Sequence, residues 1–554
     1  MDLKDLAINL ESIADPNLRR CIVGLLNIVQ QQAEEIARLR AENGTLKDEI
    51  ARLKGEQGRP NVPPNKPGGG PKHSSENQRK EPKKRDLKCK AIEIDRTQLC
   101  PVDRSMLPAD AQNKGIETTV IQDVIFRRDN VAFEREKFYS PSEGKTYLGP
   151  LPAGYAGYDF GPGVRSLVLV LYYATGASEP KILELLAHAG VQMSDGALSN
   201  FLIHDIEKFH DEKSEVQRAG LASSPWQHID DTGTRVDGVG QHCHIVGNPL
   251  FTIYSTRPDK DRLTIIRVLR DQLGSRFRVN ALAIAHAAAL GVAGGQVSLF
   301  QTLPWDIELD EDTFESALLA CMPKAGAQTR RKLYEAAAIA AYHAQGEMPV
   351  VQTLLGDAAG QFDGITDERA LCWVHEGRHY AKLTPFVAAF QTELDAFQDD
   401  FWTFYRELRV YAQAPSTVEA IRLSLAFDLL FATKSNYEAL SARIARTREN
   451  KNALLQVLEH PELPLHNNPA ELAARVRVRK RDVSFGPRTA AGARAWDTMQ
   501  SLVSTTKRLA INVYEYIADR VRGLGKIGRL ADTISERAAV LKLGASWALA
   551  EPSG

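Results

Sequence analysis

The pattern of hydrophobic and polar positions first predicts a long helix near the start of the chain. Residues 22–53 carry apolar side chains at heptad spacing, with charged residues on the exterior. β-branched residues and one asparagine occupy one core position, and leucine dominates the other, a pattern that favours a parallel two-stranded coiled coil. A single amphipathic helix lying on its own protein is the alternative. The residues predicted to form the dimer contact are Leu25, Val29, Ile36, Leu39, Asn43, Leu46, Ile50 and Leu53.

The next segments alternate between strand-like and helix-like patterns. Residues 91–150 include the runs "TTVIQDVIF" and "VAFEREKFY", which predict a small β module held by its apolar strands. Residues 164–205 instead show helical periodicity, with Ser178 and Ser194 placed as N-caps and Gly190 placed where a helix would stop. This arrangement resembles a helix-turn-helix, although many helical domains contain such a turn without touching DNA.

The second half of the chain begins with a change of period. The segment "PWQHIDDTGTRVDGVGQHCHIVGNPLFTIYSTRP" alternates as two or three strands and predicts a β-meander. A later apolar run, "VVQTLLGDAAG", predicts a buried strand that ends at Asp357. Residues 270–348 and 383–460 are predicted to be largely helical, and helices follow residue 467 to about residue 545. The predicted fold class is therefore multidomain α+β.

Composition narrows the class of protein. A chain of 554 residues is too long for one hydrophobic core, and its 43% apolar and 25% charged residues are ordinary for a globular protein. Six scattered cysteines do not form a disulfide scaffold, so we expect a reducing cytoplasm. We expect no signal peptide and no membrane span, because the N-terminus is acidic and the longest apolar stretches are too short or too rich in Ala and Gly.

The net charge of -1 hides a strong local asymmetry. Between residues 55 and 90 the chain is rich in Pro, Gly, Lys and Arg, a composition that predicts a flexible segment without a core. Its positive charge either lies along nucleic-acid phosphates or belongs to a solvated linker.

Three acidic residues occupy positions that suit metal binding. Asp230 lies in the first predicted strand, Asp357 at the end of a later strand, and Glu471 in the first turn of a helix opened by "HNNPAE". Such carboxylates can hold two Mg²⁺ or Mn²⁺ ions about 4 Å apart for in-line phosphoryl transfer. Each also has a structural interpretation: Asp230 shaping a turn, Asp357 capping a strand end, and Glu471 forming a capping box with Asn468. Composition alone does not select these three from 70 acidic residues.

Four segments together resemble the successive catalytic blocks of transposases of the insertion-sequence-66 family. They are "HIDDTGTRVDG", "LLGDAAGQFDG", "CWVHEGRHYAKL" and "HNNPAELAARVRVRKRDVSFG". In this resemblance Asp230, Asp357 and Glu471 match the family's two aspartates and its glutamate, which follows an Asn-Asn pair by three residues. The order of segments matches as well: coiled coil, Pro/Lys-rich linker, small finger module, helical domain and catalytic domain.

The resemblance implies an RNase H-like fold and a DDE transposase. Its three carboxylates would bind two Mg²⁺ or Mn²⁺ ions for cleaving DNA at the element ends and joining it to a target. The implied partners are DNA, a second copy through the coiled coil, further copies on DNA and accessory transposition proteins, in the bacterial cytoplasm at the nucleoid. A transposase-derived DNA-binding protein that no longer cuts is the alternative. The residues expected to support the active site are Asp231, Cys372, His375, Arg378, Asn467 and Asn468.

The letters "HEGRH" at residues 375–379 also fit H-E-x-x-H, the zinc motif of many metalloproteases. A zinc metalloprotease is a minor alternative, because Gly377 weakens the helix that the motif needs and no third ligand follows at a familiar spacing. We expect no structural zinc in the finger module, since "CPVD" retains only Cys100 and "YSPS" stands where a second cysteine pair would be.

The run "RVRVRKR" after Glu471 predicts phosphate contacts beside the metal site, with a solvated face as the alternative. The residues expected to bind DNA are Arg475, Arg477, Arg479, Lys480, Arg481 and Lys507.

About 127 positions separate Asp230 from Asp357, longer than the family's spacing, which indicates an insertion. The expected organisation is an N-terminal helix and coiled coil (1–57), a basic flexible linker (58–90), a degenerate zinc-finger-like β module (91–152), a helical domain (153–222), an RNase H-like catalytic domain (223–520) with helical insertions at about 270–348 and 383–460, and a C-terminal helical tail (521–554).

Overall fold

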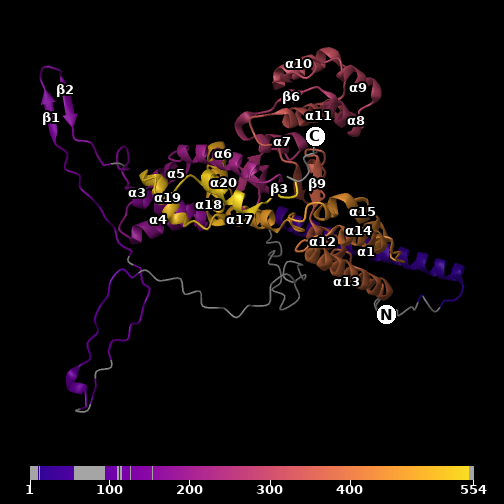
Figure 1. The fold of residues 1–554 in the computed structure, drawn as a ribbon, viewed down its shortest axis with the longest axis horizontal. Helices are drawn as coiled ribbons and strands as arrows, with labels where there is room; N and C mark the ends of the chain where they lie inside the picture. The colour runs from indigo at the N-terminus through magenta and orange to yellow at the C-terminus, as the bar shows by residue number, and fades with distance from the viewer. Residues whose placement is uncertain are drawn as a thin grey trace.

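The computed structural model describes Leu10 and residues 13–54, 94–108, 111–112, 115–124, 126–152 and 154–547. The segment predicted as a basic linker, residues 58–90, lies outside these residues. Figure 1 shows a central body, two helical lobes at its right and a hairpin that extends away at its left. No helix in the described ranges is both long enough and apolar enough to cross a membrane.

A mixed five-stranded sheet forms the centre of the body. Its strands, in the spatial order β5-β4-β3-β8-β9, are β3 (Trp226–Val236), β4 (Val239–Gly247), β5 (Thr252–Arg257), β8 (Thr353–Gly356) and β9 (Glu368–Leu371). The first three form an antiparallel meander, whereas β8 runs parallel to β3 and β9 parallel to β8. Asp237 and Gly238 have φ angles of 50° and 74°, which suit the tight β3–β4 turn. The predicted meander and the predicted strand before Asp357 are both confirmed.

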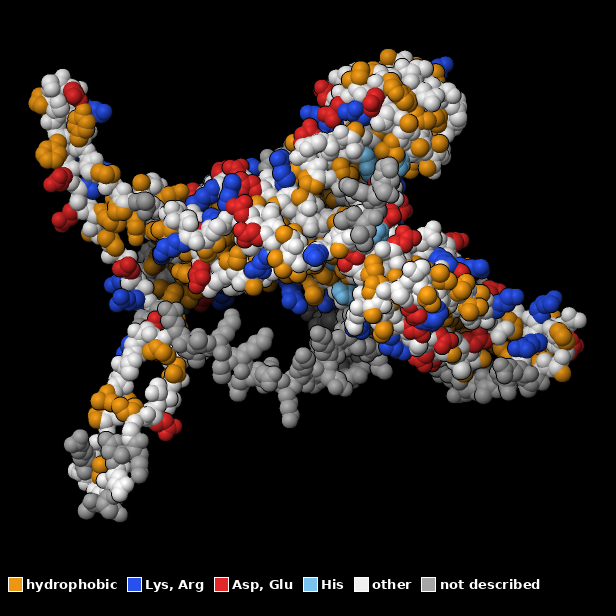
Figure 2. All heavy atoms as spheres, viewed as in Figure 1, with side chains coloured by type: hydrophobic (Ala, Val, Ile, Leu, Met, Phe, Trp, Pro, Cys, Tyr) orange, Lys and Arg blue, Asp and Glu red, His pale blue; other side chains and the backbone are white. Residues whose placement is uncertain are grey.

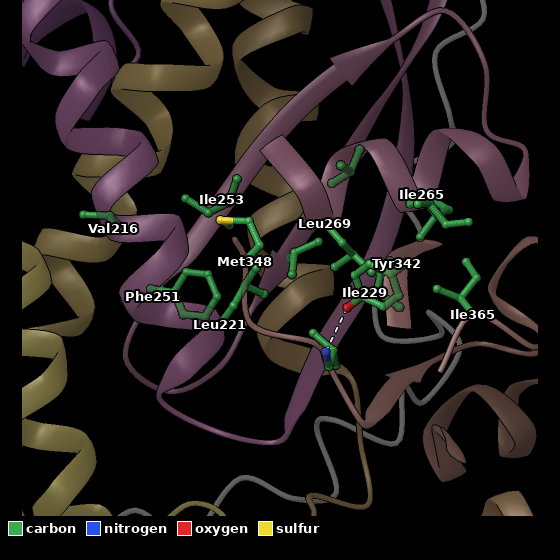
Figure 3. Close-up of a cluster of buried hydrophobic side chains, with 14 of the residues drawn as sticks. Val216, Leu221, Ile229, Phe251, Ile253, Ile265, Leu269, Tyr342, Met348 and Ile365 are labelled. Atoms are coloured by element: carbon green, nitrogen blue, oxygen red, sulfur yellow. Dashed lines mark hydrogen bonds between the residues drawn. The ribbon is translucent and has the colours of Figure 1, made fainter. Parts of the chain in front are cut away.

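Strand alternation gives the sheet two different faces. On one face, isoleucine and valine side chains join the main hydrophobic core with α6 (Glu207–Ala222), α7 (Arg262–Arg270) and α11 (Ala327–Ala344). Figure 3 shows Ile229 of the sheet in one cluster with Tyr342 of α11, whose hydroxyl accepts a 2.8 Å hydrogen bond from the N–H of Val351. Burial of apolar area on this face anchors the helices to the strands.

The opposite face of the sheet is covered by α17 (Asn468–Ser484). Its alanine side packs on β4 and β5, where a small side chain lets the helix approach the strands closely. α18 (Ala490–Arg508) covers the β5 edge of the sheet. The N–H of Tyr254 donates to Ser501 Oγ at 2.9 Å, and the N–H of Thr252 donates to Thr505 Oγ1 at 3.2 Å. The helix thus satisfies backbone groups that an open edge would leave unpaired.

Two helical lobes interrupt the sheet. The first lies between β5 and β8 and contains α8 (Ala281–Ala289), α9 (Gly294–Phe300), α10 (Glu311–Cys321) and α11, with the short strands β6 (Phe277–Arg278) and β7 (Glu308–Leu309). The second lies before α17 and contains α13 (Ala388–Tyr411), α14 (Thr417–Leu430), α15 (Glu438–Glu449) and α16 (Lys451–Leu454). The helical character predicted for residues 270–348 and 383–460 is confirmed. Figure 2 shows the lobes standing apart, with histidine side chains reaching the surface between them.

A helical group precedes the sheet in sequence and packs with the C-terminal helices. It contains α3 (Pro162–Leu169), α4 (Glu179–His188), α5 (Asp195–Ile203) and α6, while α19 (Val513–Arg522) and α20 (Leu530–Leu541) lie against it. Ser178 and Ser194 are the N-caps of α4 and α5, as predicted, and Gly190 follows α4 with a φ of 76°. α5 ends at Ile203, and α6 begins at Glu207 after a short turn.

The predicted β module is largely wrong. Its one hairpin consists of β1 (Lys137–Ser140) and β2 (Lys145–Leu148), and the run "TTVIQDVIF" forms no strand in its described residues. Phe138 is 66% exposed and Tyr139 is 63% exposed, so the hairpin has no core of its own. A two-stranded hairpin without a packed face is marginal by itself.

The long helix α1 (Pro16–Leu53) packs on its own chain in its first half and is exposed in its second half. In the first half Leu26, Asn27 and Gln30 are buried against the second lobe, where Asn27 Nδ2 donates to the carbonyl of Asn436 at 2.8 Å. In the second half Ile36, Leu39, Leu46, Ile50 and Leu53 are 49–83% exposed. Val29 is partly buried and Leu25 is 62% exposed, and the coiled-coil contact stays a prediction.

Candidate active site

The parallel pairing of β3 and β8 brings two aspartates together. His228 of β3 lies opposite Leu355 of β8, so the same register, continued by two residues, places Asp230 beside Asp357. Asp357 follows β8 directly, and its Oδ1 accepts the N–H of Ala359 at 3.1 Å. Residues 127 positions apart in the chain thus become neighbours across one strand pair.

Helix α17 supplies the third carboxylate. The β3–β4 register places Asp230 on the sheet face that α17 covers, and Glu471 lies in the first turn of α17. The capping-box interpretation of Glu471 is wrong. The N-cap is Asn467 rather than Asn468, no side chain caps this helix terminus, and Glu471 pairs with Arg378 instead.

The carboxyl group of Asp230 has a raised affinity for a proton. Burial, followed by the negative charges of Asp357, Glu471 and Asp231, raises the pKa of Asp230 from 3.8 to about 7. The 2.8 Å hydrogen bond that Asp230 accepts from the N–H of Asp231 lowers this pKa and offsets part of the rise. The site therefore concentrates negative charge that a cation would neutralise.

Two residues of α12 (Trp373–Ala381) hold Glu471. Its Oε2 accepts a hydrogen bond from Arg378 Nη2 at 2.8 Å, and its Oε1 lies 3.4 Å from His375 Nδ1. Both Oε1 and Nδ1 are buried and have no hydrogen-bond partner in the described protein. Together with the sulfur of Cys372 they form a group whose ligand atoms lie within 4.8 Å of one another. One oxygen of Glu471 is thus not satisfied by the protein alone.

Cys372 and Asn467 connect the elements that carry the site. The sulfur of Cys372 caps α12 by accepting the N–H of His375 at 3.4 Å, and it also accepts the N–H of Asn467 at 3.1 Å. Burial raises the pKa of the Cys372 thiol to about 11. The amide of Asn467 donates to the carbonyl of Ile229 at 2.8 Å and lies 2.9 Å from His228 Nδ1. These bonds fix the starts of α12 and α17 against β3.

Two other residues predicted to support the site differ in their contacts. Asp231 Oδ2 accepts a hydrogen bond from Gln361 Nε2 at 2.8 Å, so it braces the loop that follows Asp357. Asn468 is the first residue of α17, and its side chain makes no hydrogen bond to the described residues.

Arg369 of β9 is a site residue that the sequence did not predict. Its guanidinium donates to the carbonyls of Asp357 and Ala359 and pairs with Asp363. Burial, partly offset by the charge of Asp357, lowers its pKa to about 10. An arginine within a short, partly buried strand is uncommon. This unusual residue is the feature of the sequence that could have pointed to a role in the site. Arg369 fixes the backbone that presents Asp357.

The geometry at "HEGRH" differs from a metalloprotease site. Glu376 is buried and binds Arg443 and Thr447, so it is not free to act as a base. His379 belongs to no group of clustered metal-ligand atoms in the described residues. α12 runs through Gly377 despite the low helix propensity of glycine, and a Cβ at this position would lie 2.4 Å from the Trp402 ring.

Two of the residues predicted to bind DNA are buried. Arg477 is 1% exposed, pairs with Asp497 and donates to Cys243 Sγ at 3.2 Å. Lys480 is 5% exposed, and its Nζ lies 3.4 Å from the centre of the Tyr172 ring. Helical phase is the reason, since both residues lie on the buried side of α17, Arg477 against the sheet and Lys480 against Tyr172 and the carbonyl of Ala177. The DNA-binding prediction is therefore wrong for Arg477 and Lys480.

The other predicted basic residues remain accessible. Arg475 and Arg479 are exposed on the outer side of α17, four and eight positions after Glu471. Arg481 is partly exposed and donates to the carbonyl of Gly233 at 2.5 Å, and Lys507 is exposed.

Comparison with known proteins gives a relative without an assigned activity. No known family model matches the chain. The uncharacterized protein y4jO of Sinorhizobium fredii (strain NBRC 101917 / NGR234) is 30% identical over 304 residues, which make up 55% of this chain and 94% of y4jO. The chain belongs to the same protein family as y4jO.

Proposed function

We propose that the protein is a DNA transposase that cuts and joins DNA ends at a metal-dependent Asp-Asp-Glu site. The observation that carries the proposal is the grouping of Asp230, Asp357 and Glu471, in which the charges of the other two raise the pKa of Asp230. Nothing in the folding of the sheet requires three carboxyl groups on one partly buried face. A carboxyl group with a raised pKa, buried beside two further carboxylates, is typical of a functional site.

The topology supports an RNase H-like core. An antiparallel meander of three strands continues into two parallel strands, in the order β5-β4-β3-β8-β9. The carboxylates come from the central strand, from the end of its parallel neighbour and from a helix on one face. This is the arrangement that the resemblance to insertion-sequence-66 transposases implies.

The residues present fit a divalent cation. Glu471 Oε1 is buried without a hydrogen-bond partner, and burial disfavours the charged form of Asp230. Carboxylate oxygens are the donors that Mg²⁺ or Mn²⁺ prefer. The ions, when bound, would supply activation of a water or 3′-hydroxyl and stabilisation of the leaving oxygen. Arg378 keeps Glu471 in place from the other side, and Arg369 positions the Asp357 backbone.

DNA contacts are proposed on the accessible basic residues alone. Arg475, Arg479 and Arg481 follow Glu471 along α17, and Lys507 is exposed on α18. Guanidinium groups suit phosphate oxygens by charge and by their fork geometry. The exposed half of α1 is proposed to pair with a second copy, because Asn43 lies within its apolar heptad.

The test uses labelled duplexes from the DNA that flanks the gene, incubated with Mg²⁺ or Mn²⁺. Wild type is compared with Asp357→Asn and Glu471→Gln, and with the matched control variants Asp400→Asn and Glu536→Gln, whose side chains are exposed outside the site. We expect nicked and joined products from wild type and both controls, and none from the two site variants. Products that persist in the site variants would overturn the proposal. Binding of these duplexes without cleavage by wild type would favour the alternative of a retained DNA-binding protein.

A further inference from the structure

The segment that follows α17 holds an aromatic ring outside the protein. Phe485 is 86% exposed, a larger fraction than any other large hydrophobic residue of the described chain. Its backbone is left-handed, with φ 57° and ψ 4°, a conformation that bulky residues rarely adopt. Both features cost free energy, and such strain persists where surrounding contacts enforce it, often at a functional site.

Contacts with the β3–β4 hairpin fix this ring. Arg481, four positions earlier, donates from Nη1 to the carbonyl of Gly233 at 2.5 Å. Gly486 has φ 95°, and a Cβ on it would lie 2.6 Å from the carbonyl oxygen of Arg235. The Arg481 side chain before Phe485 and the backbone of Gly486 after it therefore both contact β3, and the carbonyl of Pro487 accepts the N–H of Asp237 at 3.0 Å. Contacts within the protein therefore hold the segment that carries Phe485 before any partner binds.

Exposed arginines lie on the two elements that lead to the ring. Arg475 and Arg479 on α17 and Arg235 on β3 are exposed, and none of them forms an ion pair within the described residues. Fourteen helical positions from Glu471 to Phe485 correspond to about 21 Å, or roughly six nucleotide steps along a strand. Arg475 and Arg479 lie between these two ends. A chain of phosphates fits this charge pattern, whereas an apolar protein partner would leave the guanidinium groups without counter-charges.

Resting on the proposed function, we propose that Phe485 is a stacking platform for an unpaired base of the DNA strand whose phosphates lie along Arg475 and Arg479. An aromatic ring beside cationic side chains is the combination by which proteins bind single-stranded nucleic acid. Stacking requires an exposed π-face, which a base inside a duplex does not offer. The DNA substrate is therefore distorted or frayed about six nucleotides from the reacting phosphate.

The experiment measures binding without divalent metal, so that no cleavage intervenes. Fluorescent 30-nucleotide probes are used: a duplex, the same duplex with one bulged thymine, and a single strand. Phe485→Leu keeps an apolar side chain and removes the ring, while Phe485→Trp keeps an aromatic ring. Unfolding curves confirm that both variants fold as wild type does. We expect Phe485→Leu to weaken binding of the bulged and single-stranded probes about 5- to 100-fold, with Phe485→Trp close to wild type.

A second readout locates the base. With 5-iodouracil at the bulge, irradiation is expected to cross-link wild type through the peptide that contains Phe485, and to give no such adduct with Phe485→Leu. Equal binding of the bulged probe by wild type and Phe485→Leu, or a cross-link elsewhere, overturns the stacking site. This result is distinct from failure of the proposed function, which is loss of cleavage and joining by wild type on flanking DNA. If wild type cuts and joins DNA and Phe485→Leu binds the bulged probe as wild type does, the stacking site alone is overturned.

Discussion

At the scale of single residues, Asp230 couples stability to pH. The folded chain holds its proton up to about pH 7, whereas the carboxyl group has an ordinary pKa of 3.8. The free energy of unfolding therefore falls as pH rises through this window, by at most about 4 kcal/mol. We expect Asp230→Asn to raise the free energy of unfolding clearly at pH 8 and much less at pH 5. The measurement is urea unfolding in a buffer that contains a metal chelator. Added Mg²⁺ should raise the midpoint of wild type but not of the variant. An equal effect of the substitution at both pH values would contradict this account.

The buried and exposed arginines of α17 provide a second prediction at the residue scale. Arg477→Ala leaves Asp497 buried without its partner, so we expect a loss of about 3–5 kcal/mol in the free energy of unfolding. Arg479→Ala removes an exposed side chain, and stability should change by less than about 0.5 kcal/mol. If Arg479 contacts a phosphate, its removal lowers the salt dependence of DNA binding. The slope of the logarithm of the binding constant against the logarithm of salt concentration then falls in magnitude by about one. The measurements are chemical unfolding and binding titrations at several salt concentrations. Similar stabilities of the two variants would show that the burial argument is wrong.

At the scale of elements, the contact between α12 and α13 depends on one glycine. A Cβ on Gly377 would lie 2.4 Å from the ring of Trp402 and 3.2 Å from Phe401. Alanine favours an isolated helix over glycine by about 1 kcal/mol, but overpacking costs about 1–3 kcal/mol or more. We expect Gly377→Ala to be destabilising in urea unfolding, and Trp402→Leu in the same chain to recover part of the loss. A stabilised Gly377→Ala variant would mean that helix propensity outweighs packing here.

At the scale of the whole molecule, the division of α1 into two halves sets the expected assembly. The first half is bonded to its own lobe, so we expect the exposed apolar positions from Ile36 to Leu53 to form the contact with a second copy. We expect a dimer in sedimentation equilibrium, and a monomer for the double variant Leu39→Glu and Leu46→Glu, with unchanged helix content. Substitution of Leu18→Glu, exposed before the contact with the lobe, is the matched control and should remain dimeric. A wild-type monomer at all concentrations would contradict the assembly.

The sequence by itself determined the elements whose signals are local. The period-two alternation of the meander, the N-caps Ser178 and Ser194 and the helical lobes depend on neighbouring residues, and the structure contains them. The candidate carboxylates were selected by resemblance, since no local pattern separates Asp230, Asp357 and Glu471 from other acidic residues. The weakly patterned "TTVIQDVIF" predicted a strand, and its described residues form none.

Only the tertiary structure decided which neighbours these elements acquire. The parallel register of β3 and β8 spans a whole helical lobe, and no local pattern encodes such pairing. Arg475 and Arg477 occupy equivalent positions in the run "RVRVRKR". The orientation of α17 on the sheet nevertheless exposes Arg475 and buries Arg477. Likewise Glu471 could have capped its own helix, and Arg378 from a distant segment binds it instead. Long-range packing and charge pairing are stronger there than the local preference, which is why the site exists only in the folded chain.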